Sequence, residues 1–139
     1  GAIDMPATGD FISAIKGSGA FHNELPCKVS EQNSLDELMV STTSYDYFEQ
    51  SQSMKLHEAL VKSGISTRGY SDCFGFMLLC TGRVDAVVEP LLHPWDIIPW
   101  LPIIHEAGGE FSPIAKGGFA SNQKGHGLLY DVLNANITN

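Results

Sequence analysis

Residues 89–109 have the sequence EPLLHPWDIIPWLPIIHEAGG, and the rest of the chain is arranged around this stretch. Glu89 ends a largely apolar run, residues 84–88, which is typical of a buried strand. After a short turn, Pro94 begins a predicted helix, because the N–H that proline lacks would have no partner in a first helical turn. Asp96 therefore lies where the helix dipole favours an anion and where free N–H groups can hold a phosphate. A carboxylate there could share a divalent cation with that phosphate, or it could only complement the dipole.

Further motifs accompany this stretch. They are GAIDMP at residues 1–6, GSGAFHN at 17–23, DCFGF at 72–76 and TGRVD at 81–85. Together with Trp95-Asp96 and with EAGG at 106–109, they resemble the mid-chain segment and the C-terminal signature of the inositol monophosphatase family, the magnesium-dependent phosphomonoesterases. The resemblance covers most of the chain in the family's order and becomes loose from Lys116 onwards.

This resemblance implies an α/β fold. In the family the whole enzyme stacks helices and sheets as α-β-α-β-α, and this chain is expected to hold the C-terminal α/β/α sheet domain of that layered sugar-phosphatase fold. Residues 1–33 are expected to be an incomplete remnant of the N-terminal antiparallel sheet, and residues 34–139 the C-terminal α/β domain. Because the remnant would leave an open sheet edge, we expect a homodimer or self-association.

One signature of the family is missing from the sequence. The family's Asp-Pro-x-Asp-Gly-Thr motif supplies two metal-binding aspartates, and no aspartate here lies in such a motif. We therefore interpret the chain as the C-terminal half of such an enzyme, through truncation, an incomplete gene or a natural split. The complete enzyme would use Mg²⁺, whereas this half is expected to be inactive alone and to bind Mg²⁺ weakly or not at all.

The composition narrows the possible partners. The 139 residues carry a formal net charge of −8, and the eight Lys and Arg residues form no cluster, which argues against nucleic acid or an anionic membrane as a partner. No apolar stretch of the sequence approaches the ~18–20 residues that span a bilayer. Cys27, Cys73 and Cys80 lack metal-type spacing, so we interpret them as reduced, buried thiols of a cytoplasmic protein.

Strand and helix patterns alternate along the second part of the chain, as an α/β fold requires. Strands are predicted at residues 38–42, 65–69, 85–88, 110–112 and 119–121; helices at 54–62, 72–81, 94–107 and 128–133; and loops at 44–53 and 115–118. The first helix is predicted to have one apolar face made of Met54, His57, Leu60 and Val61. Ser71 is predicted to cap the second helix, which is apolar on all sides and must be covered on more than one face. Pro99 and Pro102 are expected to bend the third helix.

Three carboxylates at strand–helix junctions are candidate site residues, because ligands of open α/β sheets collect at such junctions. They are Asp72, Glu89 and Asp96. The resemblance implies that Asp96 binds a metal ion and that Asp72 and Glu89 contact the alcohol part of the substrate, and no catalytic residue is assigned. Each of the three could instead have only a structural role. If the resemblance holds, the three carboxylates should face one cleft, with Glu89 and Asp96 as the closer pair because only a short turn separates them.

Asp72 also bears on the substrate, which the resemblance implies to be a small phosphate ester. Residues 68–73, RGYSDC, are similar to the Arg-x-x-Gly-Asp-Cys pattern of the histidinol-phosphate phosphatase branch, with Ser71 in place of Gly. A carboxylate there would favour a cationic amino alcohol phosphate, whereas inositol-specific members tend to have a small residue. The resemblance therefore implies histidinol phosphate or inositol monophosphate as the substrate. The alternative is a binding or interaction module that keeps the scaffold without catalysis.

The remaining polar residues of interest are expected to have structural roles. The histidines at positions 22, 93, 105 and 126 form no metal spacing, and His93, which adjoins the candidate site, is expected to be structural rather than to bind substrate. Glu106 is expected to support the fold or a subunit contact. Arg83 and Asp85 are expected to serve in a turn or at the surface.

Overall fold

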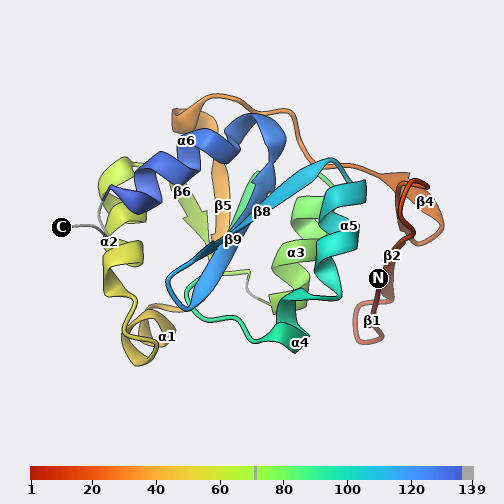
Figure 1. Ribbon diagram of the computed structural model, residues 1–139, viewed down its shortest axis with the longest axis horizontal. Coiled ribbons are helices and arrows are strands. Elements are labelled where there is room, and N and C mark those ends of the chain that lie inside the picture. The colour runs from red at the N-terminus through yellow and green to blue at the C-terminus, as the bar shows by residue number, and fades with distance from the viewer. Residues whose placement is uncertain (71, 136–139) are drawn as a thin grey trace.

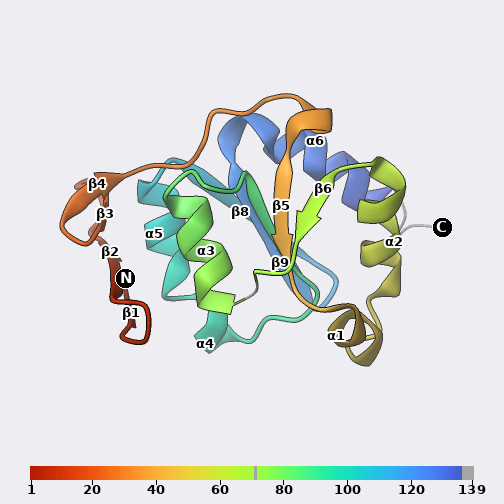
Figure 2. The same ribbon diagram turned by 180° about the vertical axis from the view of Figure 1, so that it is seen from behind.

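Two sheets and the helices around them make up the structure (Figures 1 and 2). The computed structural model describes residues 1–70 and 72–135 of the chain. Ser71 lies outside the described residues, so its role as a helix cap stays a prediction. Within the described part of the chain, no helix is long and apolar enough to cross a membrane.

The first sheet is antiparallel and comes from the N-terminal part of the chain. Its strands follow the order β1 (Ala2–Met5), β2 (Asp10–Ala14), β3 (Ala20–His22) and β4 (Leu25–Cys27). Ile12, Ala14 and Ala20 point to one face of this sheet, where they are buried in a core shared with later helices. The predicted antiparallel strands at the N-terminus are therefore confirmed.

The second sheet is mixed, with the strand order β6-β5-β7-β9-β8. Its strands are β5 (Met39–Thr42), β6 (Ser66–Arg68), β7 (Ala86–Glu89), β8 (Gly109–Ile114) and β9 (Gly117–Asn122). Strand β5 runs parallel to β6 and β7, whereas β9 runs antiparallel to β7 and β8. The C-terminal ends of β5, β6 and β7 therefore lie at one edge of the sheet.

Helices cover both faces of the second sheet (Figures 1 and 2). Helices α2 (Met54–Ser63) and α6 (Gln123–Asn134) pack on one face, and α3 (Asp72–Cys80) and α5 (Trp100–Glu106) pack on the other. Alternate residues of β7 point to opposite faces of the sheet. Ala86 and Val88 pack in the core under α2 and α6, and Val87 packs in the core under α3 and α5. The predicted α/β class is confirmed.

Helix α3 lies between the two sheets, because its core also contains residues of β2 and β3. Residues 75–80 of this helix are all buried, as predicted for a helix that is apolar on all sides. Its first turn is different. Cys73 is exposed, so the prediction that this thiol is buried is wrong, while Cys80 is buried and Cys27 is half-buried. The first turn of the helix is exposed although its sequence is largely apolar, so the sequence alone did not indicate the position of Cys73.

Two carboxylates connect segments that are far apart in the chain. Glu106, the last residue of α5, accepts hydrogen bonds from the backbone N–H groups of the β2–β3 turn, Gly17 at 2.8 Å and Gly19 at 2.9 Å, which confirms its role in supporting the fold. Asp85 is buried and accepts hydrogen bonds from the Ser30 hydroxyl and from a backbone N–H of β5. The expected surface position of Asp85 is therefore wrong, because the linker between the sheets covers it. That linker includes the short 3-10 helix Leu35–Glu37, and the division of the chain at residue 33 stays a prediction.

Two helices differ from the predicted pattern. Residues 44–53 were expected to form a loop, but helix α1 (Tyr45–Gln50) occupies most of that stretch and buries Phe48. Helix α6 begins at Gln123, five residues before the predicted start at 128. The side chain of Asn122 caps it by accepting a hydrogen bond from the Gly125 N–H at 2.6 Å.

The buried face of α2 is also shifted. Leu56, Ala59 and Leu60 are buried, whereas Val61 is 65% exposed and is not part of the face that was predicted to include it. His57 packs against the rings of Tyr45 and Phe48, as expected for a packed histidine.

The predicted long helix at 94–107 is two helices, α4 (Pro94–Ile97) and α5. Pro99 lies directly before the first residue of α5 and has no N–H to bond the carbonyl four residues earlier, so the first helix ends there. Pro102 lies in the first turn of α5, where an N–H would have no helical partner in any case. The helical conformation is therefore interrupted at Pro99, and helix α5 continues through Pro102 without a break.

Candidate functional site

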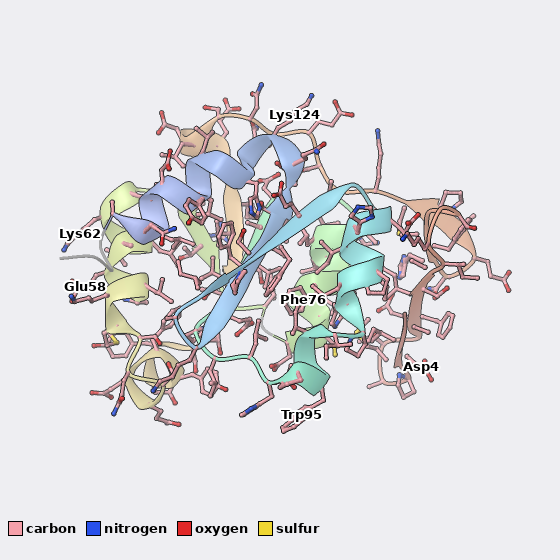
Figure 3. All side chains as sticks on the ribbon, in the orientation of Figure 1. Asp4, Glu58, Lys62, Phe76, Trp95 and Lys124 are labelled. Atoms are coloured by element: carbon pink, nitrogen blue, oxygen red, sulfur yellow. The ribbon has the colours of Figure 1, made fainter. Side chains whose placement is uncertain are left out.

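A cavity of about 270 Å³ lies at the edge where β5, β6 and β7 end. Polar and apolar surface contribute about equally to its wall: apolar residues from five elements or turns share the lining with the polar side chains of Tyr47, Asp72, Glu89 and Asp96. The apolar and thiol residues are Ile3, Cys73, Phe76, Leu91, Leu92, Trp95 and Trp100. In Figure 3, Trp95 projects from α4 at this end of the molecule, and Phe76 lies on α3 above it.

The topology of the second sheet brings the polar side chains together. Thr42 of β5 lies beside Val88 of β7 in the parallel register, and its hydroxyl donates a hydrogen bond to the Val88 carbonyl at 2.8 Å. Glu89 is the last residue of β7, and α1, α3 and α4 follow β5, β6 and β7 in the chain. The first residues of three helices and the end of one strand therefore meet at a single edge of the sheet.

Glu89 is the buried member of the group, with 3% of its surface exposed. Burial raises the pKa of its carboxyl from an ordinary 4.5 to about 7, and the nearby charges of Asp72 and Asp96 act in the same direction. A hydrogen bond from the Asp72 N–H to Glu89 Oε1, at 3.3 Å, opposes this rise. Near neutral pH the Glu89 carboxyl can therefore either accept or donate a hydrogen bond.

Asp72 and Asp96 are both exposed at the rim of the cavity. Asp72 begins α3 with a φ of 57°, in the left-handed region that aspartate tolerates better than most residues. Asp96 lies in the first turn of α4, where one carboxylate oxygen, Oδ2, accepts a hydrogen bond from the His93 N–H at 2.9 Å. The imidazole of His93 stacks on Trp95 with 4.9 Å between ring centroids, in agreement with a structural role.

The three predicted carboxylates therefore line one cavity, as expected, and the roles assigned to them stay predictions. The expectation that the carboxylates of Glu89 and Asp96 are the closer pair stays a prediction. Glu89 contacts Asp72 directly through the Asp72 backbone, and Asp72 affects the pKa of Glu89 more than Asp96 does. The left-handed start of α3 turns the Asp72 N–H towards the end of β7, and a count of residues in the turn could not reveal this.

The carboxylate oxygens suit Mg²⁺ in type, because this hard cation prefers such ligands. Among the residues that the structure describes, no group of three His, Cys, Asp or Glu side chains is arranged to hold a metal ion. Asp96 has one carboxylate oxygen besides the one that closes its own turn, so this chain could contribute one ligand to a shared site.

Tyr47 belongs to the site and was missed in the sequence. Burial and the charges of Glu89, Asp96 and Asp72, in that order, raise the pKa of its hydroxyl above the ordinary value. The signal that could have identified it is its position, since it follows β5 closely and β5 is the parallel neighbour of the strand that ends in Glu89. The expected loop at 44–53 obscured this relation.

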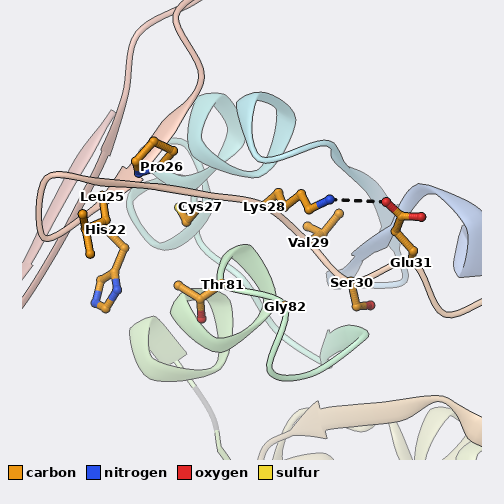
Figure 4. Close-up of a pocket in the computed structure, with 10 residues that line it drawn as sticks. All are labelled: His22, Leu25, Pro26, Cys27, Lys28, Val29, Ser30, Glu31, Thr81 and Gly82. Carbon is orange, nitrogen blue, oxygen red and sulfur yellow. Dashed lines mark hydrogen bonds and ion pairs between the residues drawn. The ribbon is translucent and has the colours of Figure 1, made fainter.

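A second, more open groove of about 530 Å³ lies at the C-terminal end of α3, beside β4 and the linker that follows it (Figure 4). Its charged side chains already have partners on the surface. Lys28 pairs with Glu31 at 3.4 Å, and Glu31 also pairs with Lys124 at 3.2 Å. His22 pairs with Asp10 at 2.6 Å. The charged groups of this groove are therefore engaged with one another, and the smaller cavity with its buried Glu89 is the better candidate site.

The comparisons with known proteins show what the whole chain is similar to. Residues 1–135 match the model of the inositol monophosphatase family. A histidinol-phosphatase from Chlorobaculum parvum is 34% identical over 111 residues, which cover 78% of this chain and 42% of the relative. A fructose-1,6-bisphosphatase/inositol-1-monophosphatase from Thermotoga maritima is 35% identical over 138 residues, which cover 96% of this chain and 52% of the relative.

A solved structure, the inositol monophosphatase from Anabaena (Nostoc) sp., has the same fold. It superimposes with a TM-score of 0.82 at 25% identity, covering 99% of this chain and 62% of that chain. The chain spans about half the length of the curated relatives it matches.

Proposed function

The chain belongs to the inositol monophosphatase family, and we propose that it is the part of a Mg²⁺-dependent phosphomonoesterase that binds the alcohol portion of a small phosphate ester. The observation that carries the proposal is the buried Glu89 between Asp72 and Asp96 in one cavity. The names of the relatives indicate a phosphatase.

In the proposed site, each carboxylate has a distinct task. Asp72 and Glu89 accept hydrogen bonds from hydroxyl or ammonium groups of the alcohol and so fix its orientation. Asp96 supplies one ligand to a Mg²⁺ ion whose other ligands lie outside the described residues. When bound, the ion neutralises phosphate charge and stabilises the leaving oxygen. The apolar wall formed by Phe76 and Trp100 limits access of water to the alcohol.

Two substrates fit this description, and the acidity of the cavity favours one of them. Three carboxylates around a small cavity attract a cationic group, as in histidinol phosphate, more strongly than the neutral ring of inositol phosphate. The histidinol-phosphatase from Chlorobaculum parvum supports the first choice, and the Thermotoga maritima relative supports the second. The proposed location of the protein is the cytoplasm, where its thiols would stay reduced.

A second candidate is a binding or interaction module that keeps the scaffold without catalysis. The observation that favours it is the absence, among residues 1–70 and 72–135, of a three-ligand group that could hold a metal ion. Such a module would still bind the alcohol in the same cavity, so binding alone does not separate the two candidates.

The deciding experiment measures phosphate release from histidinol phosphate and from inositol 1-phosphate in the presence of Mg²⁺. The 139-residue chain alone should release almost none, because each missing electrostatic stabiliser commonly lowers the rate by ~10²–10³. A chain extended at its N-terminus by the preceding half of a family member should reach about 1–10³ s⁻¹. Asp96→Asn should abolish that activity. An extended chain that binds the alcohols but releases no phosphate would favour the module.

A further inference from the structure

We infer that the hydroxyl of Tyr47 donates a hydrogen bond to the oxygen of the leaving alcohol and that Tyr47 is thereby a ligand-binding residue of the cavity. The inference rests on the proposed function, because it requires that the cavity bind the alcohol part of a phosphate ester. It adds a hydrogen-bond donor to a site in which sequence reasoning identified only carboxylates.

Tyr47 is held in place by the packing of a short helix. Phe48, the next residue of α1, is fully buried. On the side of α1 that faces α2, the Tyr45 and Phe48 rings contact His57, with centroid distances of 5.1 and 5.4 Å. Successive helix residues are about 100° apart, so these contacts direct Tyr47 away from α2 and into the cavity that it lines.

The C-terminal end of α1 is fixed as well. The Ser51 N–H donates a hydrogen bond to the Tyr47 carbonyl at 2.9 Å, and the Ser53 N–H donates one to the Phe48 carbonyl at 2.8 Å. The Ser53 hydroxyl also lies 3.4 Å from the carbonyl oxygen of Pro90, in the turn that follows Glu89. The helix that carries Tyr47 is therefore tied to the turn that follows the buried carboxylate.

The Tyr47 hydroxyl is available for a ligand. It makes no hydrogen bond to any other described residue. No buried side-chain nitrogen or oxygen in the described part of the chain lacks a partner, so this unpaired hydroxyl is open to the cavity rather than sealed in the core. A polar atom in this position gains most from a ligand that supplies the missing partner.

The chemistry of the lining indicates what that partner is. Asp72 and Asp96, when ionised, can only accept hydrogen bonds, Glu89 accepts them in its proposed role, and the thiol of Cys73 is a weak donor. An alcohol oxygen carries lone pairs that these groups cannot satisfy. Tyr47 supplies an O–H donor in the same lining, so a bound alcohol can give its proton to a carboxylate and accept one from Tyr47.

The test uses the two tryptophans of the chain, both of which line the cavity and report on binding through their fluorescence. The 139-residue chain is titrated with histidinol and with histamine, which lacks the hydroxymethyl group. The wild type should bind histidinol more tightly than histamine. Tyr47→Phe should weaken histidinol binding by about 3–10-fold and leave histamine binding unchanged. Tyr45→Phe, on the same helix, is the matched control and should change neither. If the wild type prefers inositol, inositol and its 1-deoxy analogue replace this pair.

Each outcome has a definite meaning. Equal weakening of both ligands by Tyr47→Phe, or no change in either, overturns the inference and leaves the proposed function in place. Failure of the wild type to bind histidinol or inositol overturns the proposed function and the inference together. Circular dichroism and thermal unfolding of both variants check that the fold is intact, since loss of one accessible hydroxyl should leave the unfolding midpoint unchanged.

Discussion

Replacement of Glu89 by glutamine should stabilise the protein at alkaline pH, although it alters a buried polar residue. Glu89 is almost fully buried, and the adjacent Asp72 and Asp96 charges disfavour its ionised form. Glutamine has the same shape and is never charged. Its side-chain carbonyl can keep the acceptor role towards the Asp72 N–H. The substitution therefore removes a buried charge and preserves the hydrogen bond.

The magnitude follows from the pKa of Glu89. A rise from an ordinary 4.5 to about 7 corresponds to roughly 3 kcal/mol at 1.36 kcal/mol per unit. Below pH 4.5 the carboxyl is protonated in both the folded and the unfolded chain and does not change the free energy of unfolding. Between 4.5 and 7 the folded chain binds more protons than the unfolded chain, so stability falls as the pH rises. Above pH 7 the buried charge lowers the free energy of unfolding by its full amount. Glu89→Gln should therefore raise the free energy of unfolding by about 3 kcal/mol at pH 8 but by less than about 1 kcal/mol at pH 5.

Urea unfolding in EDTA, at pH 5 and at pH 8, measures this difference without contributions from bound cations. Asp85→Asn is the matched control, because Asp85 is also buried but accepts hydrogen bonds from the Ser30 hydroxyl and the Met39 N–H. An amide can satisfy only one of these donors well, so this variant should lose about 1–3 kcal/mol. If Glu89→Gln loses stability at pH 8 as Asp85→Asn does, Glu89 is an ordinary structural carboxylate and the reasoning fails.

Two further predictions concern the sheets. Gly117→Ala should lower the free energy of unfolding by about 1–3 kcal/mol, because the added methyl group would overlap backbone atoms at the end of β7 and just after it. Gly127→Ala, in helix α6 and with no atom within 4 Å of the added methyl group, should raise the free energy of unfolding by up to about 1 kcal/mol. Equal effects of the two substitutions in urea unfolding would contradict the close approach at Gly117. The chain should also self-associate at micromolar concentration, because β1 ends the first sheet as an open edge and Leu25 of β4 is 70% exposed. A single monomeric species in light scattering, with no binding of an apolar dye, would rule this out.

The parts of the fold that were predictable from the sequence are those with a strong local or family signal. The apolar residues of α3 and the strand that ends in Glu89 follow from hydrophobicity alone. The meeting of Asp72, Glu89 and Asp96 does not follow from spacing, since 17 residues separate the first two. It became predictable only through the resemblance to a family whose strand–helix junctions share one edge.

The parts that were missed have identifiable physical reasons. Helix α1 has six residues, of which only Phe48 is buried, so it is too short and too polar to produce an apolar periodicity. Helix α6 begins among glycines, and a Cβ added at Gly125 would lie only 3.1 Å from Asn122 Oδ1 and 3.2 Å from a methyl carbon of Leu38. Glycine has a low helix propensity and therefore argues against a helix in the sequence, although the close packing around Gly125 favours it.

The break at Pro99 separates the exposed helix α4 from the core helix α5, and both contribute side chains to the cavity. Helix α5 is anchored in the core by Trp100, Ile103 and Ile104, while α4 buries no residue at all. Substitutions of the exposed Trp95 in α4 should therefore alter what the cavity holds without unfolding the protein, whereas substitutions of Trp100 in α5 should affect both the cavity and the stability of the core. For protein engineering, Trp95 is therefore the position of α4 that can be randomised to search for new substrates, while Asp96 and the partly buried Ile97 are kept.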